Sequence, residues 1–190
     1  IKQLELKKGN IIVINATSNN IFINNTKKNR YFNDNFDSVF ESLKNFIEEK
    51  NELFIKNNRN PKIFKDESKI TCIIIGVETF KNKLKFENSS QFGSLFDYAK
   101  DLSLINYIFI DSQDKIKKLE YESWYVNNVN TSQGIWIGNG IADQFSLKIN
   151  SISKEMRQEI PESFCYVIKR GKPDLVKYVE NFEVPEIFEE

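Results

Sequence analysis

The feature that most constrains the fold is the most apolar run of the sequence, Ile70–Ile75, in a chain otherwise rich in Asn and Lys. A short run of mostly β-branched residues predicts a strand buried on both faces, the usual state of a central strand in a parallel sheet. The run ends at Gly76, and Glu78 follows two positions later. Because open α/β sheets bind ligands outside the carboxyl ends of their strands, this end of the run is the predicted site.

A second apolar run and a helical pattern before it predict a strand–helix–strand unit. Residues 11–14 form the other buried strand, and after Asp34 the apolar residues recur at the spacing of one helix face. These residues are Phe36, Val39, Phe40, Leu43, Ile47 and Phe54. Either Asp34 or Asp37 is expected to cap the helix, and the polar stretch 57–61, closed by proline, to end it. Two strands joined through a helix predict parallel neighbours in one sheet.

The middle of the chain continues this alternation. Residues 81–88 are predicted to be a charged connection, 92–102 a second amphipathic helix, and 105–110 a third strand that ends at Asp111. An acid at a strand end invites a catalytic interpretation, but Asp before Ser112 is also typical of a helix N-cap. Both interpretations of Asp111 stay open.

The last part of the chain is predicted to turn antiparallel. Its elements are a strand entering a tight turn at 134–141, a short strand at 145–149, a helical turn at 153–160, and strands at 164–168 and 175–179 joined by a hairpin at 170–173. The fold class predicted is therefore α/β, with a mainly parallel sheet and an antiparallel C-terminal hairpin. Its 190 residues favour a single domain with a sizeable core.

The residue types that are missing exclude several chemistries. The chain has no histidine, which excludes Ser/His/Asp triads, Cys/His dyads and imidazole metal sites. Its two cysteines, Cys72 and Cys165, cannot form a four-cysteine zinc site, so no metal site is expected. Both lie in apolar strand-like runs, which favours reduced core residues over a disulfide.

Phosphate chemistry also lacks its usual sequence motif. None of the seven glycines belongs to a G-x-x-x-x-G-K-[ST] loop; Gly171 alone precedes a lysine, and Pro173 follows Lys172. Without that loop, the chain alone lacks the amide nest and lysine that hold the β- and γ-phosphates of ATP. We therefore expect no independent ATP hydrolysis.

Charge and hydropathy set further limits on partners. The 27 basic and 27 acidic side chains give a formal net charge of zero, so nucleic acid is not an expected partner. No segment approaches the roughly 18 apolar residues of a membrane span, and none resembles a signal peptide. The expectation is a soluble chain, which could still be a fragment of a larger membrane protein.

Aromatic residues cluster in a short window of the sequence. Trp124, Tyr125 and Trp136 lie close together, with Tyr121 beside them. Aromatic side chains are more often core than interface, but they also dominate protein-binding hot spots. The hypothesis is that Trp124, Tyr125 and Trp136 form a partner surface, and the alternative is that they belong to the core.

Two long segments, residues 134–144 and 160–173, resemble the C-terminal ATPase-like domain of the EssC family, the membrane-anchored FtsK/SpoIIIE-type ATPases of type VIIb secretion. The resemblance covers nearly the whole chain. The unit at 11–75 is similar to the part of a RecA-like (P-loop NTPase-like) domain between its P-loop helix and its Walker B strand. On that mapping, the P-loop strand and helix would precede Ile1 or be absent.

The resemblance implies the last of three ATPase-like domains in a multi-domain membrane protein, placed on the cytoplasmic side. It implies ATP and Mg²⁺ as cofactors of the parent protein and none in this domain, because Gly76 replaces the expected Walker B aspartate and leaves Glu78 as the nearby acid. An arginine finger could be sought at Arg157 or Arg170, but neither lies in a recognisable motif.

The implied partners are secreted helical proteins of the WXG type, the upstream ATPase domains of the same chain, and other copies in a hexamer. Two functions then compete. The favoured one is an interaction module that docks secreted substrates and regulates upstream ATPase domains. The alternative is one lobe of a working ATPase, completed by upstream residues or a neighbouring subunit. DNA translocation by analogy with FtsK is weak, since a neutral composition offers little attraction for phosphates.

Overall fold

The structure is a computed structural model that describes residues 11–19, 29–67 and 69–178. The chain divides into two compact units, Ile1–Val129 and Asn130–Glu190. Each unit has a sheet of its own and is described by itself. The prediction that residues 1–190 act as one domain stays a prediction.

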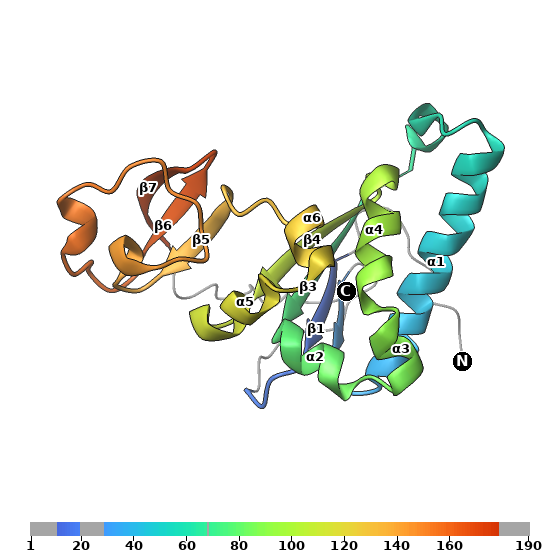
Figure 1. Ribbon diagram of the computed structural model, residues 1–190, viewed down its shortest axis with the longest axis horizontal. Helices are drawn as coiled ribbons and strands as arrows, with labels where there is room; N and C mark the ends of the chain where they lie inside the picture. The colour runs from blue at the N-terminus through green and yellow to red at the C-terminus, as the bar shows by residue number, and fades with distance from the viewer. Residues whose placement is uncertain (1–10, 20–28, 68, 179–190) are drawn as a thin grey trace, which may run out of the picture. The chain divides into compact units, whose positions relative to one another are not determined.

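A parallel sheet organises the first unit, with strand order β2-β1-β3-β4 (Figure 1). Its strands are β1 (Ile11–Asn15), β2 (Asn29–Phe32), β3 (Ile70–Ile75) and β4 (Ile105–Ile110). All neighbouring pairs are parallel, which confirms the predicted strand–helix–strand unit. β2 was not predicted, because its four residues, NRYF, show no run or alternation of apolar side chains.

Helices α1 (Phe36–Lys56), α4 (Phe92–Leu102) and α6 (Ser123–Asn128) supply most of the core over one face of this sheet (Figure 1). Every apolar residue predicted for the first helix is buried. The helix ends at Lys56, before the predicted polar stretch, and the short 3₁₀ helix η1 (Pro61–Phe64) follows. Among the described residues, no helix has the length and apolar character needed to cross a membrane.

The predicted cap of α1 is wrong. The N-cap position is Asn35, in the left-handed conformation and without a side-chain cap bond. Asp37 instead lies in the first turn of α1, and its carboxylate accepts from the backbone N–H of Lys85 at 2.9 Å and the side-chain amide of Asn88 at 2.8 Å. The acid therefore joins two segments of the chain rather than ending its own helix.

The prediction that the central strand is buried on both faces is correct for one face only. Ile70, Cys72 and Ile74 are at most 2% exposed, whereas the alternate residues of β3 are half-buried. Ile70, Cys72 and Ile74 belong to the core beneath the helices, and the alternate residues of β3 do not. An interior parallel strand can thus have a largely apolar sequence while one face stays partly open.

Residues 81–88 are not the predicted charged connection, because two short helices occupy this region. They are α2 (Val77–Lys83) and α3 (Phe86–Ser90). Phe80 is fully buried and packs edge-to-face on Phe36 and Phe92. The lysines of α2 lie outside this contact, so the segment is amphipathic over too few turns to show a clear period.

An antiparallel sheet of order β5-β6-β7 organises the second unit. Its strands are β5 (Gly134–Ile137), β6 (Phe164–Lys169) and β7 (Lys172–Lys177). The predicted hairpin is confirmed, but its turn is only Arg170-Gly171, with both residues at positive φ (53° and 75°), as a two-residue turn requires. β7 accordingly begins before the predicted residue 175, and Val179 lies outside the described residues.

A small core covers one face of this second sheet. It contains Ile141, Ala142, Met156, Tyr166 and Ile168. Two 3₁₀ helices, η2 (Ile141–Asp143) and η3 (Glu155–Arg157), supply three of these residues, and η3 confirms the predicted helical turn.

The strand predicted at 145–149 does not form. The Gln144 side chain donates to the carbonyl of Leu147 at 2.8 Å and accepts from its N–H at 2.7 Å. Because one amide side chain satisfies both backbone groups of Leu147, this segment forms a loop rather than a strand.

Candidate functional site

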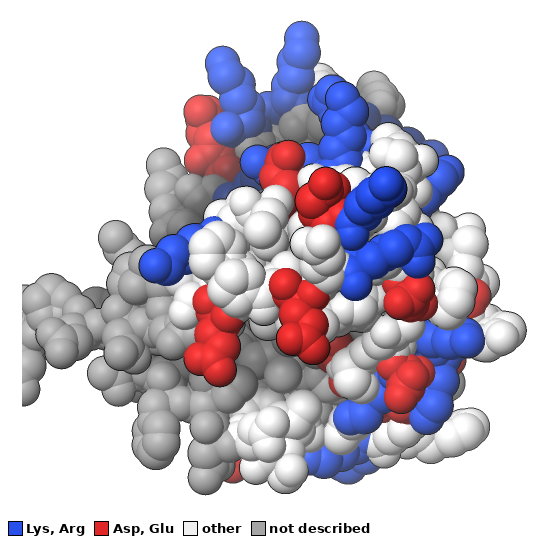
Figure 2. Space-filling view, turned by 90° about the vertical axis from the view of Figure 1, so that its left-hand side faces the viewer, with Lys and Arg blue, Asp and Glu red and all other residues white. Residues whose placement is uncertain are grey.

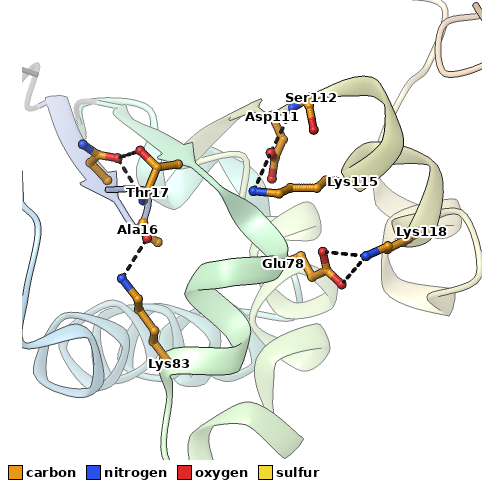
Figure 3. A network of polar contacts seen from close by, with 9 residues as sticks. Ala16, Thr17, Glu78, Lys83, Asp111, Ser112, Lys115 and Lys118 are labelled. Carbon is orange, nitrogen blue, oxygen red and sulfur yellow. Dashed lines mark hydrogen bonds and ion pairs between the residues drawn. The ribbon is translucent and has the colours of Figure 1, made fainter. Parts of the chain in front are cut away.

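The carboxyl ends of β1, β3 and β4 meet at one edge of the parallel sheet, where ligand sites of open α/β sheets lie (Figure 3). The chain leaves β1 at Asn15, β3 at Gly76 and β4 at Asp111. This edge holds the predicted Walker B-like position, and it is the candidate functional site.

Gly76 turns the chain directly from β3 into α2. Its φ of 78° is left-handed, its N–H donates to the carbonyl of Ile110 at 2.9 Å, and its carbonyl accepts from the N–H of Phe80 at 2.8 Å. A Cβ built here would lie 2.8 Å from Cγ2 of Thr17, closer than real Cβ contacts come. Both the backbone and the space therefore select glycine, and an aspartate would be strained at this position.

Glu78, the acid nearest the Walker B-like position, lies in the first turn of α2. Its carboxylate oxygens lie 3.3 and 3.4 Å from Nζ of Lys118, which belongs to α5 (Gln113–Leu119) (Figure 3). The Glu78 side chain is 30% exposed and that of Lys118 is 64% exposed. Glu78 is thus engaged in a partly solvated ion pair between two short helices.

Asp111 follows β4 and is the most buried acid at this edge, with a side chain 4% exposed. Its Oδ1 accepts from the N–H of Ser112 at 2.9 Å and lies 3.7 Å from Nζ of Lys115. The predicted N-cap role is wrong by one position, because Ser112 is the N-cap of α5. Oδ2 of Asp111 is buried and has no hydrogen-bond partner among the described residues.

Sequence reasoning missed the polar group that follows β1. Asn15 is 1% exposed; its side-chain amide donates to the carbonyl of Asn19 and to the hydroxyl of Tyr31, and its Oδ1 accepts from the N–H and hydroxyl of Thr17. Nζ of Lys83 donates to the carbonyl of Ala16 at 2.8 Å (Figure 3). The one available signal was an asparagine directly after a buried strand.

The charged side chains of Figure 3 engage one another or the backbone rather than an open space. Lys118 pairs with Glu78, Lys115 with Asp111, and Lys83 with a carbonyl oxygen. Binding of the β- and γ-phosphates needs a free lysine and a nest of backbone N–H groups. Within the described parts of the chain, no three Cys, Asp or Glu residues are grouped to hold a metal ion. The arrangement favours a closed structural network.

Two of the three predicted partner residues lie in the core. Trp124 and Tyr125 are 4% and 5% exposed, and Trp124 stacks on Phe96 with ring centroids 4.5 Å apart. A side chain buried in this way cannot contact a partner without local unfolding. The structure therefore corrects the hypothesis for these two residues and supports the core alternative.

Trp136 is half-buried, and it marks a strand whose other face is exposed. It packs against the core of the second unit, and its Nε1 donates to the carbonyl of Asn139 at 3.1 Å. Its neighbours Ile135 and Ile137 point to the opposite face and are 63% and 70% exposed. Sequence reasoning thus found the strand, and the exposed apolar residues are the two that flank the tryptophan.

Cross-strand pairing extends this exposed face over all three strands. Ile135 lies opposite Val167, and Ile137 opposite Cys165, which in turn lies opposite Val176. Val176 is 41% exposed. We call Ile135, Ile137, Val167 and Val176 the outer face. The same face also carries Asp174, opposite Val167, and the Lys169–Lys172 pair, and Cys165 on it is buried. Its exposed apolar part is therefore the β5 side, where Ile135 and Ile137 stand in place of the polar residues expected on a solvated face.

Charges of both signs are distributed over the surface. In the view of Figure 2, Lys and Arg are interspersed with Asp and Glu from the top of the face to its lower right. Arg157 lies 3.9 Å from Asp143 in an exposed pair, and Arg170 lies in the β6–β7 turn. A nucleic-acid interface would need a stripe of basic side chains. The expectation that nucleic acid is not a partner stays a prediction.

The chain belongs to the α/β class, with a parallel sheet followed by a small antiparallel sheet. We compared it with known proteins by sequence and by fold. No protein-family profile matches the sequence, and no curated protein is significantly similar to it. The similarities that do exist are to solved structures.

Those structures are the cytoplasmic domain of EssC and domains of EccC, a type VII secretion ATPase. The cytoplasmic domain of EssC aligns with 90% of this chain at a TM-score of 0.64 and 10% identity. Two structures of EccC from Thermomonospora curvata align with 95% of it, at TM-scores of 0.57 and 0.56 and identities of 15% and 12%. One of them is ATPases 2 and 3 in complex with a signal sequence peptide. The chain spans 34%, 33% and 21% of the lengths of these solved chains. The expected ATPase-like fold is confirmed.

Proposed function

We propose that this chain is a docking domain of a type VII secretion protein, which binds secreted substrates and regulates neighbouring ATPase domains without hydrolysing ATP itself. The observation that carries the proposal is the carboxyl edge of the parallel sheet. Its lysines are engaged, and Gly76 occupies the Walker B-like position in a conformation that disfavours aspartate. The similarity to solved structures of EssC and EccC supports a role of this chain in type VII secretion.

The outer face is the surface that we assign to the docking function. Ile135 and Ile137 are the most exposed aliphatic residues of the described sheets. Burying such side chains against a partner contributes about 25 cal/mol per Å² of apolar area. An amphipathic helix could lay its apolar stripe on this face, since helix recognition relies on a row of apolar anchors.

The wider setting follows as part of the same proposal. The partners would be secreted helical proteins of the WXG type, together with the ATPase domains of a longer parent chain. That parent would be a membrane protein with this domain on the cytoplasmic side, a hexamer, and a user of ATP and Mg²⁺. EccC in complex with a signal sequence peptide supports peptide binding as a property of this class of fold.

A second candidate function is an ATP-binding lobe completed by another segment or subunit. The observation that favours it is Asp111, whose buried Oδ2 has no hydrogen-bond partner among the described residues and which shares the sheet edge with Glu78. A buried carboxylate oxygen without a donor is costly. In a completed site, such an oxygen could accept from a water bound to Mg²⁺.

A binding experiment on the outer face tests the favoured function. A purified, fluorescently labelled helical protein of the WXG type is titrated with the chain and with its Ile137→Asp variant. The matched control is Ile55→Asp, because Ile55 is also exposed (53%) but lies on α1. We expect saturable binding that Ile137→Asp weakens at least about tenfold and Ile55→Asp leaves unchanged. No binding to the wild type, or equal binding to Ile137→Asp, would contradict the proposal.

A further inference from the structure

Asn139-Gly140 is the only asparagine–glycine step in a chain that is rich in asparagine. It lies in the connection between β5 and η2, and both of its residues are exposed. Asparagine is chemically labile, and a following glycine has no Cβ to obstruct the approach of its backbone nitrogen to the asparagine side chain. The step is therefore a candidate for spontaneous covalent modification.

The connection leaves room for that approach. Gly138 and Gly140 have φ of 91° and 85°, and a Cβ built on either would meet no atom of the described residues within 4 Å beyond its chain neighbours. A ring closed between the side chain of Asn139 and the nitrogen of Gly140 therefore displaces no packed side chain at these positions.

Two fixed donors hold the oxygens of Asn139. The N–H of Ile160 donates to Oδ1 at 2.8 Å, and Nε1 of Trp136 donates to the backbone carbonyl at 3.1 Å. Ile160 and Trp136 both pack against the core of the second unit, so the donors are held in place while the amide stays exposed. A fixed donor on Oδ1 stabilises the negative charge that develops on this oxygen when a nucleophile attacks Cγ.

The amides of Asn88 and Asn150, which each precede a serine, are held in the opposite way. Nδ2 of Asn88 donates to the carboxylate of Asp37 at 2.8 Å, and Nδ2 of Asn150 donates to the carbonyl of Arg170 at 3.1 Å. In both residues, the nitrogen that would leave is engaged, and the serine Cβ lies beside the nitrogen that would attack. These two asparagines are internal controls for Asn139.

We propose that Asn139 is a site of deamidation in the folded chain. The backbone nitrogen of Gly140 attacks Cγ of Asn139, so that an N–Cγ bond forms and the Cγ–Nδ2 bond breaks. The proton of the Gly140 N–H leaves with Nδ2 as ammonia. Water then opens the resulting succinimide at Cγ to give aspartate, or at the main-chain carbonyl carbon to give isoaspartate. Neither step needs an oxidant, a metal or an enzyme.

The modification changes both the charge and the backbone of the turn that ends β5. Either product adds one negative charge to a chain whose formal net charge is zero. In isoaspartate the backbone runs through Cγ and gains one methylene directly before Gly140, whose carbonyl accepts from the N–H of Asp143 at the start of η2. The proposal does not depend on the docking function assigned to the outer face.

The test incubates the full 190-residue chain in mildly alkaline buffer, folded and in concentrated urea. Peptide mapping by mass spectrometry localises each conversion of an amide to an acid, and isoelectric focusing follows the added charge. Gly140→Ala places a Cβ beside the attacking nitrogen. Gly138→Ala is the matched control, because Gly138 has a similar φ and equally open surroundings but does not carry that nitrogen.

We expect Asn139 to convert at least as fast in the folded chain as in urea, and at least about tenfold faster than Asn88 and Asn150. Gly140→Ala should slow the conversion at least about tenfold, and Gly138→Ala should leave it unchanged. Partial unfolding of Gly140→Ala would expose the amide further, so a slower reaction cannot result from lost stability.

A slower conversion of Asn139 in the folded chain than in urea would overturn the proposal, because the fold would then protect this amide. Equal rates in Gly140→Ala and the wild type would also overturn it, since the nitrogen of Gly140 would then not be the nucleophile.

Discussion

At the residue scale, Gly76 shows how backbone geometry can decide chemistry. The predicted Walker B-like position, Gly76, is held at φ 78°, with Cγ2 of Thr17 only 2.8 Å from a hypothetical Cβ. A left-handed residue with a side chain costs about 1–2 kcal/mol, and a close contact adds to that. The turn from β3 into α2 therefore disfavours an aspartate at this position.

This account predicts that Gly76→Ala lowers the free energy of unfolding by about 2–4 kcal/mol. Gly140→Ala is the control, because Gly140 has a similar φ of 85° but nothing within 4 Å of its hypothetical Cβ. Gly140→Ala should lower the free energy of unfolding only by the cost of a left-handed alanine, about 1–2 kcal/mol. Urea unfolding followed by circular dichroism measures both.

Thr17→Ser separates the contact from the backbone effect. It removes the Cγ2 methyl that would meet the new Cβ, and it keeps the hydroxyl that donates to Asn15. In the Gly76→Ala background it should restore part of the lost stability. If Gly76→Ala costs no more than Gly140→Ala, the contact with Thr17 does not constrain this position.

Asp37 links pH to the stability of the first unit. The backbone N–H of Lys85 is the main cause that holds the pKa of its carboxyl below the usual value; burial opposes this, and the amide of Asn88 assists. Since the folded state prefers the charged carboxylate, the contribution is fully present above the unfolded pKa of about 4. It is lost as the pH falls through the lowered pKa of the folded state.

Asp37→Asn should therefore reduce the free energy of unfolding at pH 7. The difference in this free energy between the wild type and the variant should become smaller as the pH falls below about 4. Urea unfolding at pH 7, 5 and 3 measures this difference. An equal loss at pH 7 and pH 3 would show that the side chain acts through its shape and hydrogen bonds, and that its charge has no part.

At the scale of elements, the sequence predicted those whose periodicity extends over several turns or a full strand. α1, α4 and the strands β1, β3, β4 and β6 lie where their apolar patterns place them. The short elements were missed or misassigned, because α2 and α3 offer only one or two turns and β2 only four residues. The loop at 145–149 depends on one side chain, Gln144, whose contact with Leu147 no local pattern indicates.

The candidate site was predicted in position but not in geometry. The sequence placed it after β3, with Gly76 and Glu78, and the absence of independent ATP hydrolysis stays a prediction. It could not show the partners Lys118 and Lys115, because ion pairs between separate helices depend on the crossing of those helices. The orientation of aromatic residues is equally non-local, which is why Trp124 and Trp136 looked alike in the sequence.

Those two tryptophans give a prediction for their helix and strand. Trp124 on α6 contacts Phe92, Phe96 and Phe109 and is 4% exposed, so Trp124→Ala should cost about 3–5 kcal/mol of unfolding free energy. Trp136 on β5 is half-buried, so Trp136→Ala should cost clearly less. Chemical unfolding of both variants tests the order, and a larger loss for Trp136→Ala would contradict the assignment of Trp124 to the core.

At the scale of the whole molecule, two sheets carry separate tasks in this account. The parallel sheet of the first unit retains an ATPase-like fold, while the charged groups at its carboxyl edge are engaged with one another. The antiparallel sheet of the second unit presents an apolar outer face. On the proposed function, a fold that resembles ATPase domains serves recognition, since fold alone does not determine function.

The most direct test of the central claim is a calorimetric titration of the folded chain with ATP and Mg²⁺. The account predicts no saturable heat up to millimolar nucleotide, since the lysines at the carboxyl edge are engaged and a phosphate-binding loop is missing from the sequence. Saturable binding with micromolar affinity would contradict the account. It would show that other residues rebuild a phosphate site, and the ATP-binding lobe would then be the better description of this chain.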